Sequence, residues 1–201
     1  MNKIVVDFVC VGCGVGLDPA ARNCEYCGRV VVIRSFTSIA SATNLELNKL
    51  AAAAKKYGDE HPDDPEITQL RFTAAACHLR LKRYDDAIKR FEEAIEDNFD
   101  FADTYFYAAV SLLRGKRPFL ALMNDVKKMV EHLNAATSIE PKGIYFYLLG
   151  YIKQDFYERK SLRISPSSSE EYASASANDV TQEDIRMLGE LLNHPLSAPR
   201  H

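Results

Sequence analysis

The sequence predicts a mainly α-helical protein in which helix pairs stack into a solenoid, preceded by a small β-type module held by metal. Three observations carry this prediction. Four of the five cysteines stand within the first 27 residues, a 34-residue pattern recurs from residue 72 onward, and the composition changes toward Ala, Leu, Lys and Glu after residue 43. With 201 residues, of which 47% are hydrophobic, the chain can bury a core without disulfides.

Charge and hydropathy narrow the classes of partner. The net charge of −3 gives no global attraction to nucleic acid or anionic lipid. The N-terminal stretch MNKIVVDFVCVGC is not apolar enough for a signal peptide, because Asp7 interrupts it. No later segment approaches the roughly 18 apolar residues of a membrane span. We therefore expect a soluble, cytoplasmic protein without a membrane partner, in which clustered cysteines more often hold metal than form disulfides.

The cysteine spacing predicts a tetrahedral metal site. Two CxxC pairs, Cys10 with Cys13 and Cys24 with Cys27, flank a ten-residue loop. Tetrahedral zinc takes four ligands, thiolates at about 2.3 Å, and each CxxC turn can place two on one side of the ion. The glycine after each pair can adopt the positive φ that helps backbone amides point at the sulfurs. Because all four ligands are cysteine, no position is left for a catalytic water, and we predict a structural Zn²⁺.

Residues 1–34 resemble a zinc ribbon. The apolar runs FVCV and RVVVI predict short strands beside the cysteines. The segment is similar to prokaryotic ribbons of the double-zinc-ribbon type, in which two CxxCG turns flank a loop containing leucine and proline. Leu17 and Pro19 fill that loop pattern, whereas Asn23 stands where the family often has an aromatic residue. Iron bound by the same ligands and a zinc-thiolate redox sensor are the alternatives. Cys77 lies on a helical pattern and is expected to be a small buried residue.

A 34-residue repeat follows the ribbon. Residues 35–43 are rich in Ser, Thr and Ala and are interpreted as a linker, after which Asn44 is expected to cap a helix. FTAAACHLRLKR at 72–83 matches FYAAVSLLRGKR at 106–117 in seven of twelve positions. A third copy begins at 145–147 with a shift of 40, so we expect six extra residues in the second repeat.

A 34-residue period made of two helices resembles the tetratricopeptide repeat (TPR). The second helix of the first copy carries the family's pattern of small and aromatic residues at Tyr84, Ala87, Phe91 and Ala94. Small residues are needed where helices approach closely, and the aromatic residue fills the space beside them. The resemblance implies TPR-like helical repeats over residues 44–160, with Gly150 at a close-packed position of a first helix.

The C-terminal part departs from the repeat. Residues 161–180 are interpreted as low-complexity or weakly helical, with Ser167 or Ser168 as a cap. A helix over 181–193 is expected to open with Thr181 and Asp184 and to be followed by a tail, 194–201. Its apolar stripe consists of Ile185, Leu188, Leu191 and Leu192. Such a helix suits the end of a repeat array as a capping helix, with a partner-binding helix as the alternative.

The sequence predicts no enzyme. It contains no Walker loop, GxSxG or HExxH motif, and its five histidines are scattered. His78 falls on a first helix and is expected to pack or cap. Acidic pairs such as Asp85 and Asp86 suit the positive end of a helix dipole better than acid–base catalysis.

The resemblance instead implies a binding groove lined by the first helix of each repeat. Phe72 with Phe106 would form an apolar strip beside a basic edge of Arg80 and Arg114, suited to an amphipathic helix or an acidic peptide. The family members that grip a chaperone's C-terminal carboxylate use lysine and asparagine where Phe72 and Ala76 stand, so that clamp is disfavoured here. The predicted groove residues are Gln69, Phe72, Ala76, Leu79, Arg80, Asp103, Phe106, Val110, Leu113 and Arg114.

These patterns favour a non-catalytic adaptor or scaffold that binds protein partners through its repeats and carries a structural zinc. The alternative is a nucleic-acid-associated regulatory factor whose ribbon makes the contact. Arg22, Arg29 and Arg34 could cluster there with Tyr26 available for stacking, but residues 1–34 carry a net charge of only +1.

Overall fold

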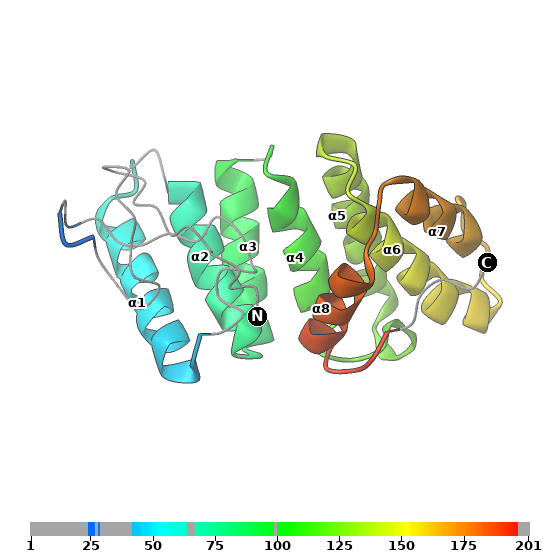
Figure 1. The fold of residues 1–201 in the computed structure, drawn as a ribbon, viewed down its shortest axis with the longest axis horizontal. Helices are drawn as coiled ribbons and strands as arrows, with labels where there is room; N and C mark the ends of the chain where they lie inside the picture. Colours follow the sequence, from blue (N-terminus) through cyan, green and yellow to red (C-terminus); the bar gives the residue numbers. More distant parts are fainter. Residues whose placement is uncertain (1–23, 27, 29–41, 64–66, 99, 197–201) are drawn as a thin grey trace, which may run out of the picture. The chain divides into compact units, whose positions relative to one another are not determined.

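The computed structural model describes residues 24–26, 28, 42–63, 67–98 and 100–196 (Figure 1). These residues form helices and contain no strand, and the strands predicted beside the cysteines lie outside the described ranges. The chain divides into two compact units, Met1–Asn98 and Phe99–His201, each of which is considered by itself. Within the described residues, no helix combines the length and apolar character needed to span a bilayer.

Unit 1 contains α1 (Asn44–Glu60), α2 (Ile67–Arg80) and α3 (Tyr84–Asp97), with α2 packed against both neighbours (Figure 1). Helix α1 is capped by Thr43, one residue before the predicted Asn44. The Thr43 hydroxyl accepts the Glu46 N–H at 3.3 Å, and the Glu46 carboxylate accepts the Thr43 N–H at 2.7 Å. This reciprocal capping box satisfies two helix-terminal donors, which explains the earlier start.

Small residues bring the helices of unit 1 together. Ala54 of α1 packs with Leu70 and Ala74 of α2 in one buried cluster. On the α3 side, Phe72 meets Phe91 edge to face, with ring centroids 5.8 Å apart. The second-helix alanines Ala87 and Ala94 are fully buried, as the repeat pattern requires.

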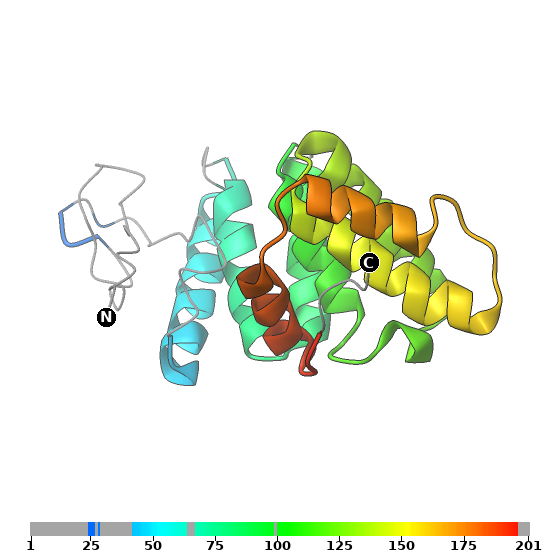
Figure 2. The same ribbon diagram turned by 45° about the vertical axis from the view of Figure 1, so that its right-hand side comes forward.

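Unit 2 contains two helix pairs and a further helix (Figure 2). Helix α4 pairs with α5, and α6 pairs with α7. Between α4 and α5, the connection 113–122 contains a 3-10 turn at Pro118–Leu120, whereas the equivalent connection between α2 and α3 is only 81–83. The extra residues of the second repeat therefore lengthen this connection. The helices are α4 (Ala102–Leu112), α5 (Met123–Ile139), α6 (Gly143–Ile152), α7 (Ser168–Ala177) and α8 (Gln182–Leu192).

Helix α6 continues as a π-helical segment, Lys153–Tyr157, and ends in a 3-10 turn, Glu158–Lys160. Lys153 and Asp155 within the π segment are both buried. A π turn changes the direction in which successive side chains leave the helix. Here it accompanies the burial of two charged residues that both find partners inside unit 2.

Two capping boxes start the last helices. Ser167 accepts the Glu170 N–H and donates to the Glu170 carboxylate, so the second half of 161–180 is helical. Thr181 and Asp184 make the same arrangement at the start of α8. All four residues of the predicted apolar stripe on α8 are buried.

Two glycines allow α6 to approach its neighbours. A Cβ atom added to Gly150 would lie 2.8 Å from the Tyr172 ring of α7. A Cβ atom on Gly143 would lie only 2.6 to 2.7 Å from backbone atoms of Ala175, Asn178 and Val180. The Gly143 N–H also donates to the Asn178 carbonyl at 3.1 Å, so this end of α6 is fixed to the chain that follows α7.

We expect Gly143→Ala to destabilise unit 2 by at least about 3 kcal/mol, the upper end of the usual cost of overpacking, because backbone cannot move aside as a side chain can. Urea unfolding followed by circular dichroism measures this cost. The matched control is Gly58→Ala in α1, where the added Cβ would lie 3.2 Å from the mobile Cδ1 of Ile67. Alanine favours the helix there, so stability should change by less than about 1 kcal/mol. Equal unfolding of the two variants would contradict the packing described for Gly143.

Candidate functional site

The described part of the cysteine segment forms one tight turn. Cys24 is buried, and the Gly28 N–H donates to the Cys24 carbonyl at 2.8 Å. Gly28 has φ +74°, the positive value expected for the glycine after a CxxC pair. Cys10, Cys13 and Cys27 lie outside the described residues. The residues that the structure does describe contain no cluster of three or more His, Cys, Asp or Glu side chains able to hold a metal ion.

Cys77 is the fifth cysteine, and it lies in the interior of α2 with no exposed surface. Burial raises the pKa of its thiol to about 12, so at neutral pH the thiol stays protonated and unreactive. The prediction of a small buried residue is confirmed.

The predicted groove residues of α2 divide into buried and partly exposed members. Phe72, Ala76 and Leu79 are buried in unit 1, and the Phe72 ring packs on Phe91. Gln69 and Arg80 are half-buried. As placed, the apolar members contribute to packing, and only the polar members present atoms to solvent.

The equivalent residues of α4 follow the same division. Phe106, Val110 and Leu113 are buried, with the Phe106 ring 4.9 Å from the Tyr145 ring of α6. Asp103 is half-buried and Arg114 is exposed, where Arg114 pairs with Asp125 of α5 at 3.4 Å. The apolar strip proposed from the sequence therefore does not lie open on either first helix. That these residues bind a partner remains a prediction.

Asp103 connects α4 to the start of α6. Its carboxylate accepts hydrogen bonds from the Lys142 ammonium, at 3.1 Å, and from the Tyr145 hydroxyl. Burial and the neighbouring Asp103 carboxylate both raise the pKa of Tyr145, so the phenol remains a donor. Asp103 thus has a structural role that its position in the predicted groove did not indicate.

Asp155, a buried carboxylate in the π segment, accepts hydrogen bonds from three donors. It accepts hydrogen bonds from Arg117, from Arg159 at 2.8 Å and from the Phe119 N–H at 2.9 Å. Burial acts to raise the pKa of Asp155, but these hydrogen bonds outweigh burial and hold it below its usual value. The Arg159 guanidinium also stacks 4.5 Å from the Phe119 ring. Asp155 therefore ties the long α4–α5 connection to the end of α6.

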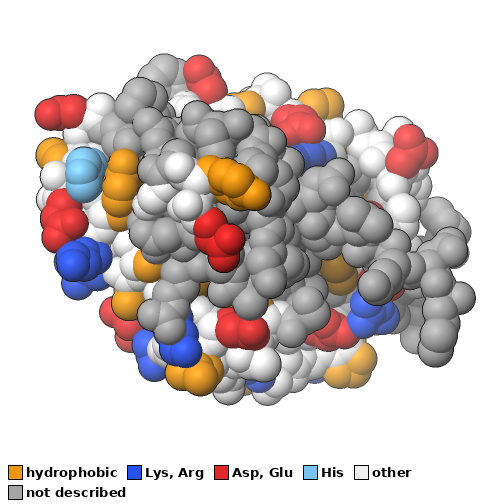
Figure 3. Space-filling model, turned by 60° about the vertical axis from the view of Figure 1, so that its left-hand side comes forward, with side chains coloured by type: hydrophobic (Ala, Val, Ile, Leu, Met, Phe, Trp, Pro, Cys, Tyr) orange, Lys and Arg blue, Asp and Glu red, His pale blue; other side chains and the backbone are white. Residues whose placement is uncertain are grey.

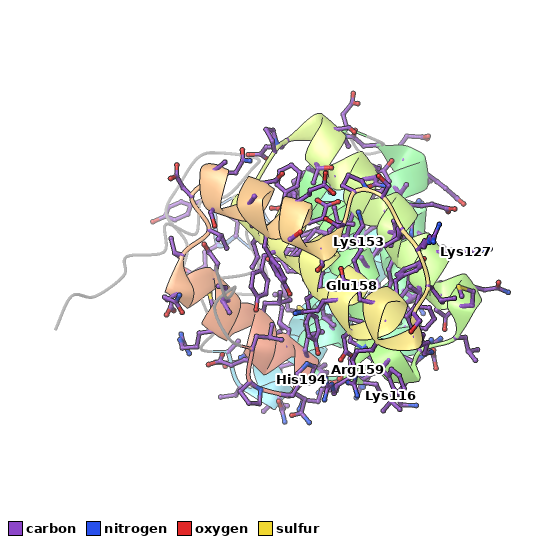
Figure 4. All side chains as sticks on the ribbon, turned by 90° about the vertical axis from the view of Figure 1, so that its right-hand side faces the viewer. Lys116, Lys127, Lys153, Glu158, Arg159 and His194 are labelled. Atoms are coloured by element: carbon purple, nitrogen blue, oxygen red, sulfur yellow. The ribbon has the colours of Figure 1, made fainter. Side chains whose placement is uncertain are left out.

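Lys153 and Glu171 form a buried ion pair between α6 and α7, and Figure 4 places Lys153 between these helices. Each side chain is at most 6% exposed. A buried pair contributes little net stability over an apolar pair, but loss of one partner leaves an uncompensated charge. This pair therefore favours the observed packing of α7 against the end of α6.

The two ends of α8 reach α4 and α6. Burial raises the pKa of Tyr107 on α4, and the carboxylates of Asp103 and of Asp184, in the first turn of α8, raise it further. His194, beyond the last turn of α8, shares a hydrogen bond of 2.8 Å with the Tyr151 hydroxyl of α6. We call the surface that carries Tyr107 and Tyr151 the α4–α6 face. In Figures 1 and 2, α8 lies beside these helices within unit 2.

Surface charges are mixed in sign. Among the described residues on the face in Figure 3, acidic, basic and hydrophobic side chains all occur. Both arginines of the RGKR block, residues 114–117, have acidic partners, because Arg114 pairs with Asp125 and Arg117 with Asp155. Charges of both signs therefore lie close together at this part of unit 2.

Sequence reasoning missed the polar network of unit 2. The contact of Arg117 with Asp155 joins residues 38 positions apart, and that of Tyr151 with His194 joins residues 43 positions apart. No local sequence motif could predict either contact. The π segment likewise has no pattern of its own. The one available signal was the run of buried-type residues YFYLLGYI followed by lysine and aspartate on the same helix.

Comparison with known proteins gives a partial relationship. No protein-family model matches the chain. It is similar to the Hsp70-Hsp90 organising protein of Plasmodium falciparum (isolate 3D7), with 28% identity over 131 residues. The match covers 62% of this chain and 22% of that protein, so the chain spans about a fifth of its relative's length. Together, the similarity and the packed helix pairs support a TPR-like part in this chain.

The acceptor role of Asp155 predicts an acid-sensitive contribution to stability. At pH 7, Asp155→Asn should lower the free energy of unfolding by about 1.5–3 kcal/mol, because charged hydrogen bonds are lost. A folded-state pKa below the unfolded value means that the contribution is present above about pH 4 and is lost as the pH falls further, through the folded pKa. The difference between wild type and Asp155→Asn should therefore shrink below about pH 4 in urea titrations.

The control is Asp125→Asn, which removes the longer and more exposed pair with Arg114. It should cost less than about 1 kcal/mol. A difference between wild type and Asp155→Asn that stays constant from pH 7 to pH 3 would contradict this assignment.

Proposed function

We propose that this protein is a non-catalytic adaptor whose TPR-like helix pairs bind protein partners and whose N-terminal cysteines hold a structural zinc. The packed helix pairs of both units are the observation that carries the proposal, because stacked helices offer extended surface and no reactive centre. The similarity to a protein named for organising two chaperones supports the same role.

Partner contact is proposed at the polar residues of each first helix, taken separately in unit 1 and unit 2, since the apolar residues there are buried. Gln69 and Arg80 of α2 and Asp103 and Arg114 of α4 keep exposed surface. Edges of mixed charge suit a polar peptide or the charged side of an amphipathic helix, and such contacts depend strongly on salt.

Chaperones are candidate partners because the similar protein is named for organising Hsp70 and Hsp90. The sites that would hold a C-terminal carboxylate carry Phe72 and Ala76, both buried and neither able to donate a side-chain hydrogen bond. We therefore propose that a chaperone partner would be bound by another of its segments.

Zinc is proposed to bind Cys10, Cys13, Cys24 and Cys27. The turn at Cys24 supports this, because Gly28 adopts the left-handed conformation that lets the chain fold back after the second CxxC pair. A zinc ion bound by these thiolates would join the two turns and stabilise the segment without chemistry of its own.

Metal analysis tests the zinc proposal. The purified wild type should contain about one zinc per chain, and Cys24→Ser or Cys27→Ser should lose most of it because a four-thiolate cage needs every ligand. The helical circular dichroism signal should change little, since none of the described helices contains these residues. Cys77→Ala is the matched control and should retain zinc. Stoichiometric iron, or zinc that survives both serine substitutions, would count against the proposal.

Charge reversal tests the binding surface. Arg80→Glu with Arg114→Glu should reduce recovery of partners in affinity purification and mass spectrometry from the native host at least tenfold, because attraction becomes repulsion. Lys127→Glu, a charge reversal at an exposed position on the second helix α5 (Figure 4), should leave recovery unchanged. Equal recovery with all variants would place the contact elsewhere. Substituting Phe72 or Phe106 is less informative, because both rings are buried and their loss would disturb folding.

A further inference from the structure

Helix α8 covers a surface that the helix pairs of unit 2 would otherwise present. Its apolar residues Ile185, Leu188 and Leu192 are at most 2% exposed. In Figures 1 and 2 α8 lies beside α4 and α6, and His194, just beyond its C-terminal end, shares a hydrogen bond of 2.8 Å with the Tyr151 hydroxyl of α6. The helix therefore extends along the α4–α6 face, which belongs to the first helices of two successive repeats.

The interactions that make α8 helical are contained in α8 itself. The Thr181–Asp184 capping box starts it, and Asn193 ends it in the left-handed conformation at φ 59°. On the exposed side, Arg186 pairs with Glu183 and with Glu190. Because none of these interactions involves α4 or α6, the segment keeps its helical preference when it leaves the α4–α6 face.

The connection before α8 is held separately from the helix. The Asn178 carbonyl accepts the Gly143 N–H, and Asp179 turns the chain with φ 57°. Residues 178–181 can therefore remain attached to the start of α6 while α8 moves. The contact of His194 with Tyr151 acts at the opposite end, where it closes α8 onto α6.

We infer that α8 is an internal ligand of the α4–α6 face, and that an amphipathic helix from a protein partner takes its place. The inference rests on the proposed adaptor function and specifies how a partner would bind at the α4–α6 face. The occupant in the structure defines the chemistry of the partner, a helix with apolar residues at the spacing of Ile185, Leu188, Leu191 and Leu192.

Tethering keeps α8 in place in the absence of a partner. A short connection gives an attached segment an effective concentration in the millimolar range. A free helix of equal intrinsic affinity therefore binds the closed chain far more weakly than a chain whose own α8 has been displaced. This difference is the quantity to measure.

The experiment uses the full chain and a fluorescent peptide of residues 178–196 as the probe. Leu188→Asp with Leu192→Asp places two carboxylates on the buried side of α8 and should displace it. Fluorescence polarisation should then show the peptide binding to this variant at least tenfold more tightly than to wild type. Arg186→Ala changes only the exposed side and should behave as wild type. Tyr151→Phe removes the bond to His194 and should raise peptide affinity by a smaller factor.

Hydrogen exchange on the same proteins separates the outcomes. In the Leu188→Asp/Leu192→Asp variant, α8 should lose protection while α4 to α7 retain it. Loss of protection throughout unit 2 would show that α8 is part of the core, and retained protection without peptide binding would show that the uncovered face binds no helix. Either result overturns the inference.

Two further outcomes are informative. Dimers of the wild type formed by exchange of α8 would identify a second copy of this chain as the occupant and would overturn the inferred protein partner. A host partner that binds the wild type without changing the protection of α8 would also overturn the inference, while the adaptor function itself would stand.

Discussion

Close approach of helices at small residues is the constraint on which both units depend. In unit 1, Ala54 and Ala74 sit where α1 and α2 meet, and in unit 2 Gly143 and Gly150 lie against α7 and the chain after it. Helices this close leave no open channel beside them, so large neighbours such as Phe72 become enclosed. Because this packing buries the apolar groove residues of α2 and α4, only the polar groove residues keep exposed surface. A binding surface on these helices must therefore consist of polar residues.

Local chemistry explains which features could be predicted from the sequence. The helix start at Thr181 was predictable because a capping box involves residues three apart, and the repeat was visible because close packing restricts residue size at fixed spacing. The cap of α1 was misplaced by one residue, since Asn44 and Thr43 are both good caps and only Thr43 has Glu46 three positions later. The burial of Phe106 was not predictable, because its neighbour Tyr145 comes from the next repeat.

Unit 2 departs from a simple repeat through its buried charges. Lys153 and Glu171 meet between α6 and α7, and Asp155 binds the long α4–α5 connection. Residues that meet from such distant parts of the sequence leave no periodic signal. The groove predicted from the repeat spacing therefore contained neither the Lys153–Glu171 pair nor Asp155. Separating Lys153 from Glu171 would leave two buried charges without partners, which disfavours any arrangement that parts them. The Lys153–Glu171 pair therefore holds α7 in one position against α6. The Gly143–Asn178 hydrogen bond holds the beginning of the connection between α7 and α8.

Unit 2 offers a partner two kinds of surface, an exposed charged one and the α4–α6 face that α8 covers. The exposed Arg114 can meet a partner without any change in the packing of unit 2, and such binding should weaken steeply as salt screens the charges. Binding at the α4–α6 face instead requires α8 to leave, so its affinity reflects competition with a tethered helix and depends less on salt. The two modes therefore predict different responses to ionic strength, and a partner that uses both would bind in two steps, first at the charged edge and then by replacing α8.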